Sequence, residues 1–495
     1  MPPGATSSGN GQNGAKGKPT PRMLPPGMTA EQFQQLATRL QDAVGGDNFQ
    51  VLSPATKLDD GDYVNVDCQT HDMHFLYDRD DFIGSCLVHP RKGHNLGYGG
   101  AAPRVPGSVV MNLGTHMNRI LKVNTDDCYA IVEPGVTYME LQDHLRKHKL
   151  QDKVWLDCPE LGYGSIIGNA LDHGVGFTPY GDHWTFHCGM ESPEGRHQAA
   201  AGVPPQDQEP NECRGLFPYG FGPVNDGIFS QSGNGIVTKM GVWLMPAPPG
   251  YEPFMITYEN EDGLAAVVDI VRPLRVSVVL QNAAALRHIS LDASHYRPRS
   301  FYADKPLDEP LTEEEFSAAA KKIDMCYWVY MGRRVRAQAG AGRAPRHHQG
   351  IGGWCELRWL SHWMPNCSFL SFSPISKASG ESAKAQYGLA KRRFKEARLD
   401  YMGILSVGLR EMHNVICVVF DRENVDMRRR AQWLVRTMIK DCADNGWGEF
   451  RTHTSLMGQV AMTYDFDDNA LMRLNEIIKN ALDPKGILAP GKSGI

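Results

Sequence analysis

Short apolar runs that end at glycine or proline alternate along this chain with amphipathic, capped helices, and this alternation restricts the fold more than any other feature. Residues 108–114 (SVVMNLG) and 129–135 (YAIVEPG) are typical of strands. Thr137, with Glu140 three positions later, predicts a capping box in front of a helix. Strands interspersed with helices indicate an α+β or α/β arrangement.

The composition changes along the chain and suggests where domains begin and end. Residues 1–28 are rich in Gly, Pro, Ser and Asn, which predicts a disordered tail, and a helix is expected from Thr29. A strand signal over residues 235–246 ends in the Pro/Gly-rich residues 246–250, which mark a boundary. Beyond it, the periodicity predicts a second domain whose sheet is covered on one side by helices. The expected helices span residues 311–323, 380–399 and 427–446, and the expected strands lie within residues 404–420.

Residues 332–353 differ from their surroundings. They contain five arginines and many Ala and Gly residues, without a strand or helix period. A flexible surface loop is the favoured interpretation. The alternative is an arginine-rich nucleic-acid contact, but the segment lacks the interleaved aromatic residues that such contacts use.

Charge and hydropathy exclude several classes of function. The net charge is −5 and the pI about 6.4, so we expect neither a nucleic-acid nor a membrane partner. No apolar stretch approaches the roughly 18 residues of a membrane span. Eleven cysteines without a C-x-x-C pair, and no apolar leader, predict an intracellular protein with reduced thiols and no cysteine-based metal site. The final residues, Ser493 to Ile495, do not form a Ser-Lys-Leu peroxisomal address.

Two irregular stretches combine glycine with polar and aromatic residues. Residues 92–104 (KGHNLGYGGAAPR) either form a turn-rich loop or bring backbone N–H groups close to a phosphate. Residues 159–184 contain Glu160, Asp182 and His183 in a long loop, where such residues are often functional, although each is equally compatible with a satisfied core group.

Two further motifs lie nearer the C-terminus. In NGWGEFRTH (residues 445–453), Arg451 is suited to an anionic substrate oxygen, and the alternative is a surface ion pair. In GLREMHN (residues 408–414), His413 is either a general acid/base or simply a packed histidine.

Taken together, these motifs resemble the vanillyl-alcohol oxidase family, which includes eugenol oxidase and para-cresol methylhydroxylase. The matching pieces follow the family's order from about residue 60 to the C-terminus. They are NLGYGGAAPRVPGSVV, AIVEPGVTYMELQDHL, GSIIGNALDHGVGFTPYGDHW, FPYGFGP, GIFSQSGNGIVTKMGVWLMP, GLREMHNVICVVF, NGWGEFRTH and DPKGILAPGKSGI.

The resemblance implies an α+β flavoprotein of two domains. An FAD-binding domain of the para-cresol methylhydroxylase type would comprise residues 29–250 and 447–495, and a cap domain over the flavin would comprise residues 251–446. The family oxidises para-substituted phenols, which bind as phenolates and lose a benzylic hydride to flavin N5, and dioxygen or an electron carrier reoxidises the flavin. Donors around the phenolate oxygen stabilise its charge. Family members are often dimers or larger, so a homo-oligomer is expected.

The resemblance also implies roles for individual residues. Tyr98 and Arg451 match two members of a phenolate clamp, and Phe450 occupies the place of the third, usually a tyrosine. Glu160 stands in place of an aspartate near flavin N5, and His413 matches a histidine of the active-site region. The FAD contacts implied by the matched motifs are Asn95, Gly97, Gly99, Gly100, Glu133, Gly135, Gly164, Ser165, Gly168, Asn169, Gly235, Ile236 and Phe369.

The chain departs from the family pattern at several of these positions. Phe369 stands where the comparison oxidase attaches its flavin through histidine, so we expect FAD to bind non-covalently. Phe177 replaces another usual tyrosine. Three segments are shortened, and the first of them, before Lys92, belongs to the pyrophosphate-binding unit.

Three hypotheses therefore follow from the sequence. The first is a phenol-directed FAD oxidoreductase with Tyr98, Glu160, His413 and Arg451 around the substrate. The second is a catalytically silent relative that binds FAD weakly or not at all, which the shortened segments and Phe369 favour. The third is an FAD enzyme for non-phenolic alcohols, which the loss of a tyrosine at position 450 favours.

Overall fold

A computed structural model describes most of the chain, with gaps in the N-terminal half and around residue 350. The described residues are 24–52, 56–57, 63–64, 85–88, 103–159, 162, 164–192, 213, 215–282, 284–336 and 363–495. Several predicted site residues lie outside this part of the chain. These are Asn95, Gly97, Tyr98, Gly99, Gly100 and Glu160.

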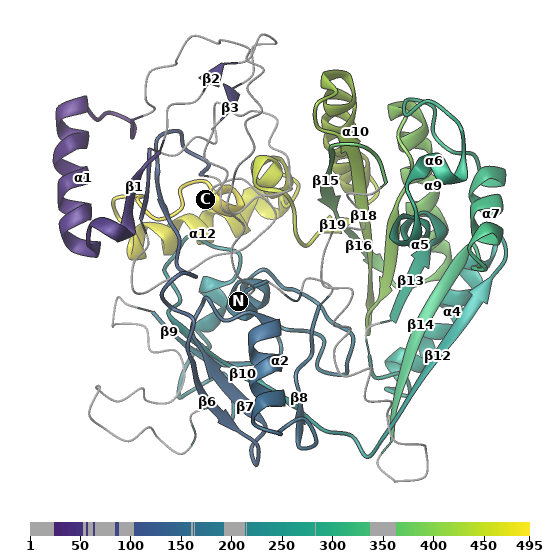
Figure 1. Ribbon diagram of the computed structural model, residues 1–495, viewed down its shortest axis with the longest axis horizontal. Coiled ribbons are helices and arrows are strands. Elements are labelled where there is room, and N and C mark those ends of the chain that lie inside the picture. Colours follow the sequence, from purple (N-terminus) through teal and green to yellow (C-terminus); the bar gives the residue numbers. More distant parts are fainter. Residues whose placement is uncertain are drawn as a thin grey trace, which may run out of the picture.

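The described elements form two lobes (Figure 1). The first lobe holds small sheets, one of which is a four-stranded antiparallel sheet in the order β6-β7-β10-β9. These strands are β6 (Ile120–Asn124), β7 (Tyr129–Val132), β10 (Lys239–Trp243) and β9 (His187–Glu191). Helices α2 (Tyr138–Lys147) and α3 (Ile166–Leu171) share one apolar core with this sheet.

The remaining elements of the first lobe are short. A three-stranded sheet pairs β1 (Phe49–Val51) with β4 (Cys86–Val88), and β4 in parallel with β5 (Val109–Met111). The others are α1 (Ala30–Val44), η1 (Gly46–Asn48), η4 (Asp226–Phe229) and the strand pairs β2 (Thr56–Lys57) with β3 (Tyr63–Val64) and β8 (Val154–Trp155) with β11 (Met245–Pro246).

The second lobe is built on an eight-stranded antiparallel sheet in the order β12-β14-β13-β17-β18-β16-β19, with β15 also paired to β18. Its strands are β12 (Gly250–Tyr258), β13 (Ala284–His288), β14 (Trp328–Arg336), β15 (Cys367–Phe372), β16 (Pro374–Lys377), β17 (Gly403–Val407), β18 (Glu411–Asp421) and β19 (Gly448–Glu449).

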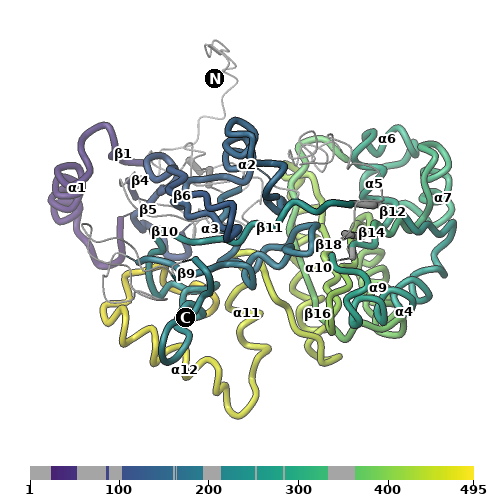
Figure 2. The backbone as a smooth tube through the Cα atoms, turned by 90° about the horizontal axis from the view of Figure 1, so that it is seen from below, coloured from purple at the N-terminus to yellow at the C-terminus, as the bar shows by residue number. Residues whose placement is uncertain are grey.

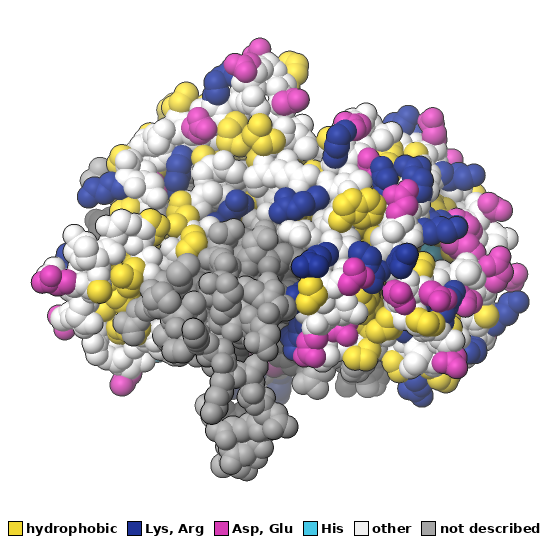
Figure 3. All heavy atoms as spheres, turned by 90° about the horizontal axis from the view of Figure 1, so that it is seen from above, with side chains coloured by type: hydrophobic (Ala, Val, Ile, Leu, Met, Phe, Trp, Pro, Cys, Tyr) yellow, Lys and Arg dark blue, Asp and Glu magenta, His cyan; other side chains and the backbone are white. Residues whose placement is uncertain are grey.

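Helices complete the second lobe and bury its core against the sheet. Helix α9 packs against both α4 and α10, and these helices contact β17 and β18 of the sheet; Figure 2 shows all three in the second lobe. The helices of this lobe are α4 (Gly263–Val276), α5 (Ile289–Tyr296), α6 (Arg299–Tyr302), α7 (Glu313–Lys322), α9 (Gly380–Ala397) and α10 (Val425–Asp444). On the face seen in Figure 3, acidic and basic side chains are interspersed over this lobe, as the small net charge of −5 leads one to expect.

The C-terminal segment returns to the first lobe, where both ribbon views place it beside the N-terminal elements (Figures 1 and 2). It contains η6 (Thr454–Leu456), α11 (Met457–Ala461), α12 (Phe466–Leu482) and η7 (Lys492–Gly494). At the first predicted domain boundary, residues 246–250, the chain passes from β11 to β12. At the second, residue 447, β19 follows directly and still pairs with β16 of the second lobe. The domain limits given above remain predictions.

The α+β class and the local helix signals are confirmed. Helix α1 begins after Thr29, and Thr29 and Thr137 both form full capping boxes. One expectation is wrong: residues 332–336 are not loop but the end of β14, because their backbone pairs with β12 from Gly250 to Phe254. The rest of the arginine-rich stretch lies outside the described residues, and so do residues 1–23 of the expected tail. Residues 24–28 of that tail form a turn in which the Met28 N–H donates to the Pro25 carbonyl.

Replacing Thr137 with alanine is expected to lower the free energy of unfolding by about 1 kcal/mol. The Thr137 hydroxyl accepts from the Glu140 N–H at 3.1 Å, and the Glu140 carboxylate accepts from the Thr137 N–H at 2.8 Å. The T137S variant keeps the hydroxyl and serves as the control in denaturant unfolding. Equal stability of T137A and T137S would contradict the role of the cap.

Candidate active site

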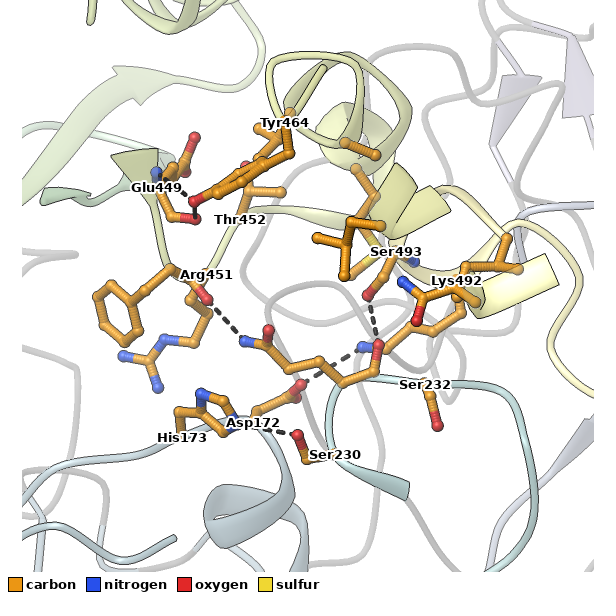
Figure 4. Close-up of a pocket in the computed structure, with 18 of the residues that line it drawn as sticks. Asp172, His173, Ser230, Ser232, Glu449, Arg451, Thr452, Tyr464, Lys492 and Ser493 are labelled. Atoms are coloured by element: carbon orange, nitrogen blue, oxygen red, sulfur yellow. Dashed lines mark hydrogen bonds and ion pairs between the residues drawn. The ribbon is translucent and has the colours of Figure 1, made fainter. Parts of the chain in front are cut away.

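A cavity of about 510 Å³ lies where the C-terminal segment meets both lobes (Figure 4). Its walls come from segments that are far apart in sequence. They include residues 172–173 after α3, residues 227–234 around η4, Ile375 of β16, residues 449–452 after β19, the helices α11 and α12, and residues 492–495. This volume lies within the range of about 300–1,000 Å³ that is usual for sites of small molecules and cofactors.

The eight-stranded sheet brings together three of the predicted catalytic residues. In β16, Ile375 pairs with His413 of β18 on one side and with Gly448 of β19 on the other. The Phe450 ring, just after β19, therefore lies beside the His413 ring at a centroid distance of 4.4 Å. The Arg451 guanidinium carbon lies 5.2 Å from the centre of the Phe450 ring, which is within cation–π range.

A second histidine, His173, shares the cavity wall with Arg451. His173 has a left-handed backbone with a φ of 55°, and its Nε2 lies 2.9 Å from the Ser230 hydroxyl. In Figure 4 the Arg451 guanidinium is directed toward the His173 ring. The two side chains come from different lobes and meet across this end of the cavity.

Burial and the neighbouring cation both favour the neutral form of these two histidines. Burial lowers the pKa of His173 and of His413, and Arg451 acts in the same direction on each, while acidic neighbours, among them Asp182, oppose the shift. The site thus combines a permanently charged guanidinium with two imidazoles that are able to accept a proton at neutral pH. Arg451 is suited to stabilising an anionic oxygen in this position.

Hydrogen bonds between loops hold this wall in place. The Gln231 side-chain amide donates to the Phe450 carbonyl at 2.7 Å, and the Ser493 hydroxyl donates to the Gln231 carbonyl. Lys492 forms an ion pair with Asp172 at 3.4 Å. These contacts join the first lobe and the C-terminal segment to the residues after β19 that include Arg451.

A buried polar network lies beneath the long loop that the sequence singled out. His183 Nε2 lies 2.7 Å from the Asp157 carboxylate, and its Nδ1 lies 2.6 Å from the Asn169 amide nitrogen. Asp157 also accepts from the backbone N–H groups of Phe177 and Thr178. Although burial opposes it, the hydrogen bonds and charge of His183 hold the pKa of Asp157 below its usual value. His183 is therefore a satisfied internal group that fixes the loop bearing Phe177.

Most of the predicted cofactor contacts have structural partners of their own. Ser165 caps α3, accepting from the Gly168 N–H at 3.0 Å, and Glu133 pairs with Arg119 at 2.6 Å. Gly135 has a steric reason to be glycine, because a Cβ there would lie 2.4 Å from the Gly114 carbonyl oxygen. Phe369 is 4% exposed in the core of the second lobe.

None of the described cofactor candidates is among the residues that line the cavity, and their role stays a prediction. They are Glu133, Gly135, Gly164, Ser165, Gly168, Asn169, Gly235, Ile236 and Phe369. Of the predicted site residues that the structure describes, only Phe450 and Arg451 line the cavity, and sequence reasoning missed the rest of its lining, including four polar residues that the contacts above single out. These are His173, Ser230, Gln231 and Lys492. His173 and Ser230 stand inside matched motifs, so polar residues next to the conspicuous glycines would have been the signal to follow.

Within the ranges that the structure describes, no group of three His, Cys, Asp or Glu side chains is arranged to hold a metal ion. Among the same residues, no helix combines the length and apolar character that crossing a bilayer requires.

Comparison with known proteins gives this site a context. A family model described as FAD binding domain matches residues 88–192, and one described as FAD linked oxidases, C-terminal domain, matches residues 374–493. The flavoprotein subunit of 4-cresol dehydrogenase (hydroxylating) from Pseudomonas putida is 30% identical over 522 aligned positions, which cover 96% of this chain and 98% of that protein.

Solved structures of similar sequence and fold indicate the same class of protein. A 4-ethylphenol oxidase from Gulosibacter chungangensis, in complex with isoeugenol, is 31% identical with a TM-score of 0.84, covering 95% of this chain and 99% of that one. A substrate-bound p-cresol methylhydroxylase is 28% identical with a TM-score of 0.83, covering 96% and 99%. The fold is thus that of an FAD-linked oxidase with a cap domain. The chain belongs to the phenol-oxidising vanillyl-alcohol oxidase and p-cresol methylhydroxylase family.

The residues around the cavity fit a flavin. The wall has apolar side chains such as Ile228, Ile375 and Val460, together with the cationic groups of Arg451 and Lys492. FAD combines a flat flavin ring that has polar edges with an anionic pyrophosphate, so this lining is chemically compatible with part of the cofactor.

Proposed function

We propose that this chain is an FAD-dependent oxidoreductase that oxidises para-substituted phenols, such as 4-hydroxybenzylic or 4-allylphenol compounds. The observation that carries the proposal is Arg451. It is a fixed cation on a cavity wall, beside Phe450 and His413, in a chain that is 30% identical over its length to a 4-cresol dehydrogenase flavoprotein.

Arg451 binds the phenolate oxygen of the substrate, and Tyr98 is expected to supply a second donor. Charge on that oxygen is delocalised toward the para carbon, which favours loss of a hydride from the benzylic position. FAD, when bound, supplies N5 as the hydride acceptor. Because Phe450 has no hydroxyl, the clamp lacks a third donor, and the ring instead packs between His413 and Arg451.

His413 and Glu160 are the proposed proton carriers. His413 is a partly buried imidazole next to the Phe450 ring, and burial lowers its pKa, so it is able to take up a proton near the substrate. Glu160, which lies outside the described residues, is the proposed general base toward the reacting carbon. The final electron acceptor in this proposal is dioxygen or an electron carrier.

FAD is proposed to bind without a covalent link. The benzyl side chain of Phe369 has no nucleophilic atom, and it is buried in β15 opposite Val419 of β18. The test is the visible spectrum of the purified protein before and after acid precipitation. Flavin bands that pass into the supernatant are expected, whereas flavin that stays with the pellet would show that another residue forms the bond.

The phenol requirement is tested by comparing para-hydroxy substrates with their para-methoxy analogues. We expect only the para-hydroxy compounds to bleach the flavin spectrum under anaerobic conditions, because only they form the phenolate that Arg451 binds. Equal rates with both series would instead support an enzyme for non-phenolic alcohols. Absence of bound flavin, even after incubation with FAD, would support the catalytically silent relative.

A further inference from the structure

Glu449 stands immediately before the residues that form the proposed phenolate site, and its surroundings are unusual for a carboxylate. It is the last residue of β19, it lines the cavity, and it is 8% exposed. Neither of its carboxylate oxygens has a hydrogen bond of normal geometry within the described part of the chain. The described residues also include no cation that forms an ion pair with it.

The neighbouring elements do not supply a compensating charge. Helix α10 presents Cys442, whose pKa is raised by burial and by Glu449, and Asp441, which is already paired with Arg393 at 2.6 Å. On β16, Lys377 points to Glu381 at 3.4 Å and is largely exposed. A buried carboxylate without a partner is costly, so such a group is expected to remain protonated. Burial raises the pKa of Glu449 to about 8, although the Thr452 side chain and the Ser373 backbone favour the charged form.

The backbone of Glu449 is held by a single side chain, Tyr464, from the loop between α11 and α12. The Glu449 N–H donates to the Tyr464 hydroxyl at 3.1 Å, and that hydroxyl donates to the Glu449 carbonyl at 2.8 Å (Figure 4). Gly448 permits this approach, because a Cβ there would lie 2.7 Å from the Tyr464 oxygen. The Tyr464 hydroxyl therefore fixes the backbone at Glu449, whereas the Glu449 carboxyl has no hydrogen bond of its own within the described residues.

We propose that Glu449 is a positioning residue: as a neutral acid it stays buried and leaves the adjoining residues Phe450 and Arg451 in place on the cavity wall, and its ionisation displaces them. Ionisation adds a charge that needs water or a cation, and no described residue pairs with it, so the carboxylate is expected to turn toward the cavity that it lines. The segment from residue 449 to residue 452 moves with it. The proposal deepens the function given above, since Arg451 is the residue being positioned, but its test needs neither substrate nor FAD.

The experiment measures amide hydrogen exchange of the peptide covering residues 447–453 in the full-length protein, between pH 6 and pH 9.5. Rates are corrected for the intrinsic pH dependence of exchange. In the wild type, protection of this peptide is expected to fall severalfold above about pH 8. In E449Q, which mimics the neutral acid, protection should stay constant over the same range. E381Q removes an exposed carboxylate, 84% accessible on α9, and should behave as the wild type.

Thermal unfolding provides a second readout. A raised pKa in the folded state means that stability is fully present below about pH 4.5 and is lost as the pH rises toward about 8. Relative to wild type, the folding equilibrium constant of E449Q should therefore increase by up to about tenfold per pH unit across this window. The side-chain amide of E449Q also changes the stability by an amount that does not depend on pH. The diagnostic quantity is therefore the slope of stability against pH.

Two results would overturn the proposal. Parallel pH dependences of unfolding in the wild type and E449Q would mean that Glu449 is not a buried neutral acid. Different slopes combined with an unchanged exchange profile of residues 447–453 would mean that the acid is buried but does not position the strand. Y464F removes the hydroxyl clamp and leaves Glu449 intact, and it should raise exchange of this peptide at every pH. Because neither readout uses a substrate, these outcomes test the role of Glu449 even if the enzyme proves inactive toward phenols.

Discussion

Replacing Arg451 with methionine is expected to reduce kcat/KM toward para-hydroxy substrates by about two to three orders of magnitude. Methionine retains much of the length and apolar contact of arginine but removes the charge and the donors that face His173 and the cavity. R451K keeps a charge without the rigid fork of donors, so an intermediate loss is expected. Steady-state kinetics at a fixed FAD concentration measures both variants.

The matched control is R473M, which removes a half-exposed arginine from α12. It should leave kcat/KM within about twofold of wild type, because an exposed ion pair of this kind contributes little. If R451M retained more than about a tenth of the wild-type kcat/KM, the phenolate clamp would have to be assigned to other residues.

Replacing Asp400 with alanine is expected to lower the free energy of unfolding by about 3–5 kcal/mol. Asp400 and Arg299 form an ion pair at 2.6 Å in the core of the second lobe, and their side chains are 3% and 2% exposed. Asp400 also accepts from the Trp363 indole at 3.0 Å and from the Leu311 N–H at 2.8 Å. The substitution leaves the Arg299 charge buried without its carboxylate.

D143A provides the comparison, because Asp143 pairs with Arg146 at 3.3 Å on an exposed face of α2. Its loss should cost less than about 1 kcal/mol. Denaturant unfolding of both variants is to be measured without added FAD, since a ligand that binds the folded state adds to stability. Similar losses in the two variants would show that burial is not what makes the Asp400 pair important.

Features that depend on neighbours in sequence were predictable. The capping box predicted at Thr137 needs only a hydroxyl and a carboxylate three positions later, and it forms, as does the helix predicted from Thr29. Helices α7, α9 and α10 follow from apolar periodicity within a single segment. Arg451 and His413 stood out because each lies in a compact motif, and the structure places both beside the Phe450 ring.

Features that depend on distant pairing were not predictable. Ile375 lies between His413 and Gly448, yet nothing in the local sequence of β16 indicates either partner. The hydrogen bond from Gln231 to Phe450 joins residues 219 positions apart. Residues 332–336 have a loop-like composition, but pairing with β12 makes them a strand, as tertiary context often does for strand propensity.

The origin of the cavity walls has a consequence for how such enzymes diversify. Residues 227–234 come from the first lobe, whereas Ile375 and the turn after β19 belong to the edge of the eight-stranded sheet. Recombination that exchanged only residues 374–452 between relatives would replace one wall and leave the other as inherited. Such chimaeras offer a route by which the preference for the oxidised compound changes, provided that the hydrogen bonds of Gln231 with Phe450 and with Ser493 still form in each new combination.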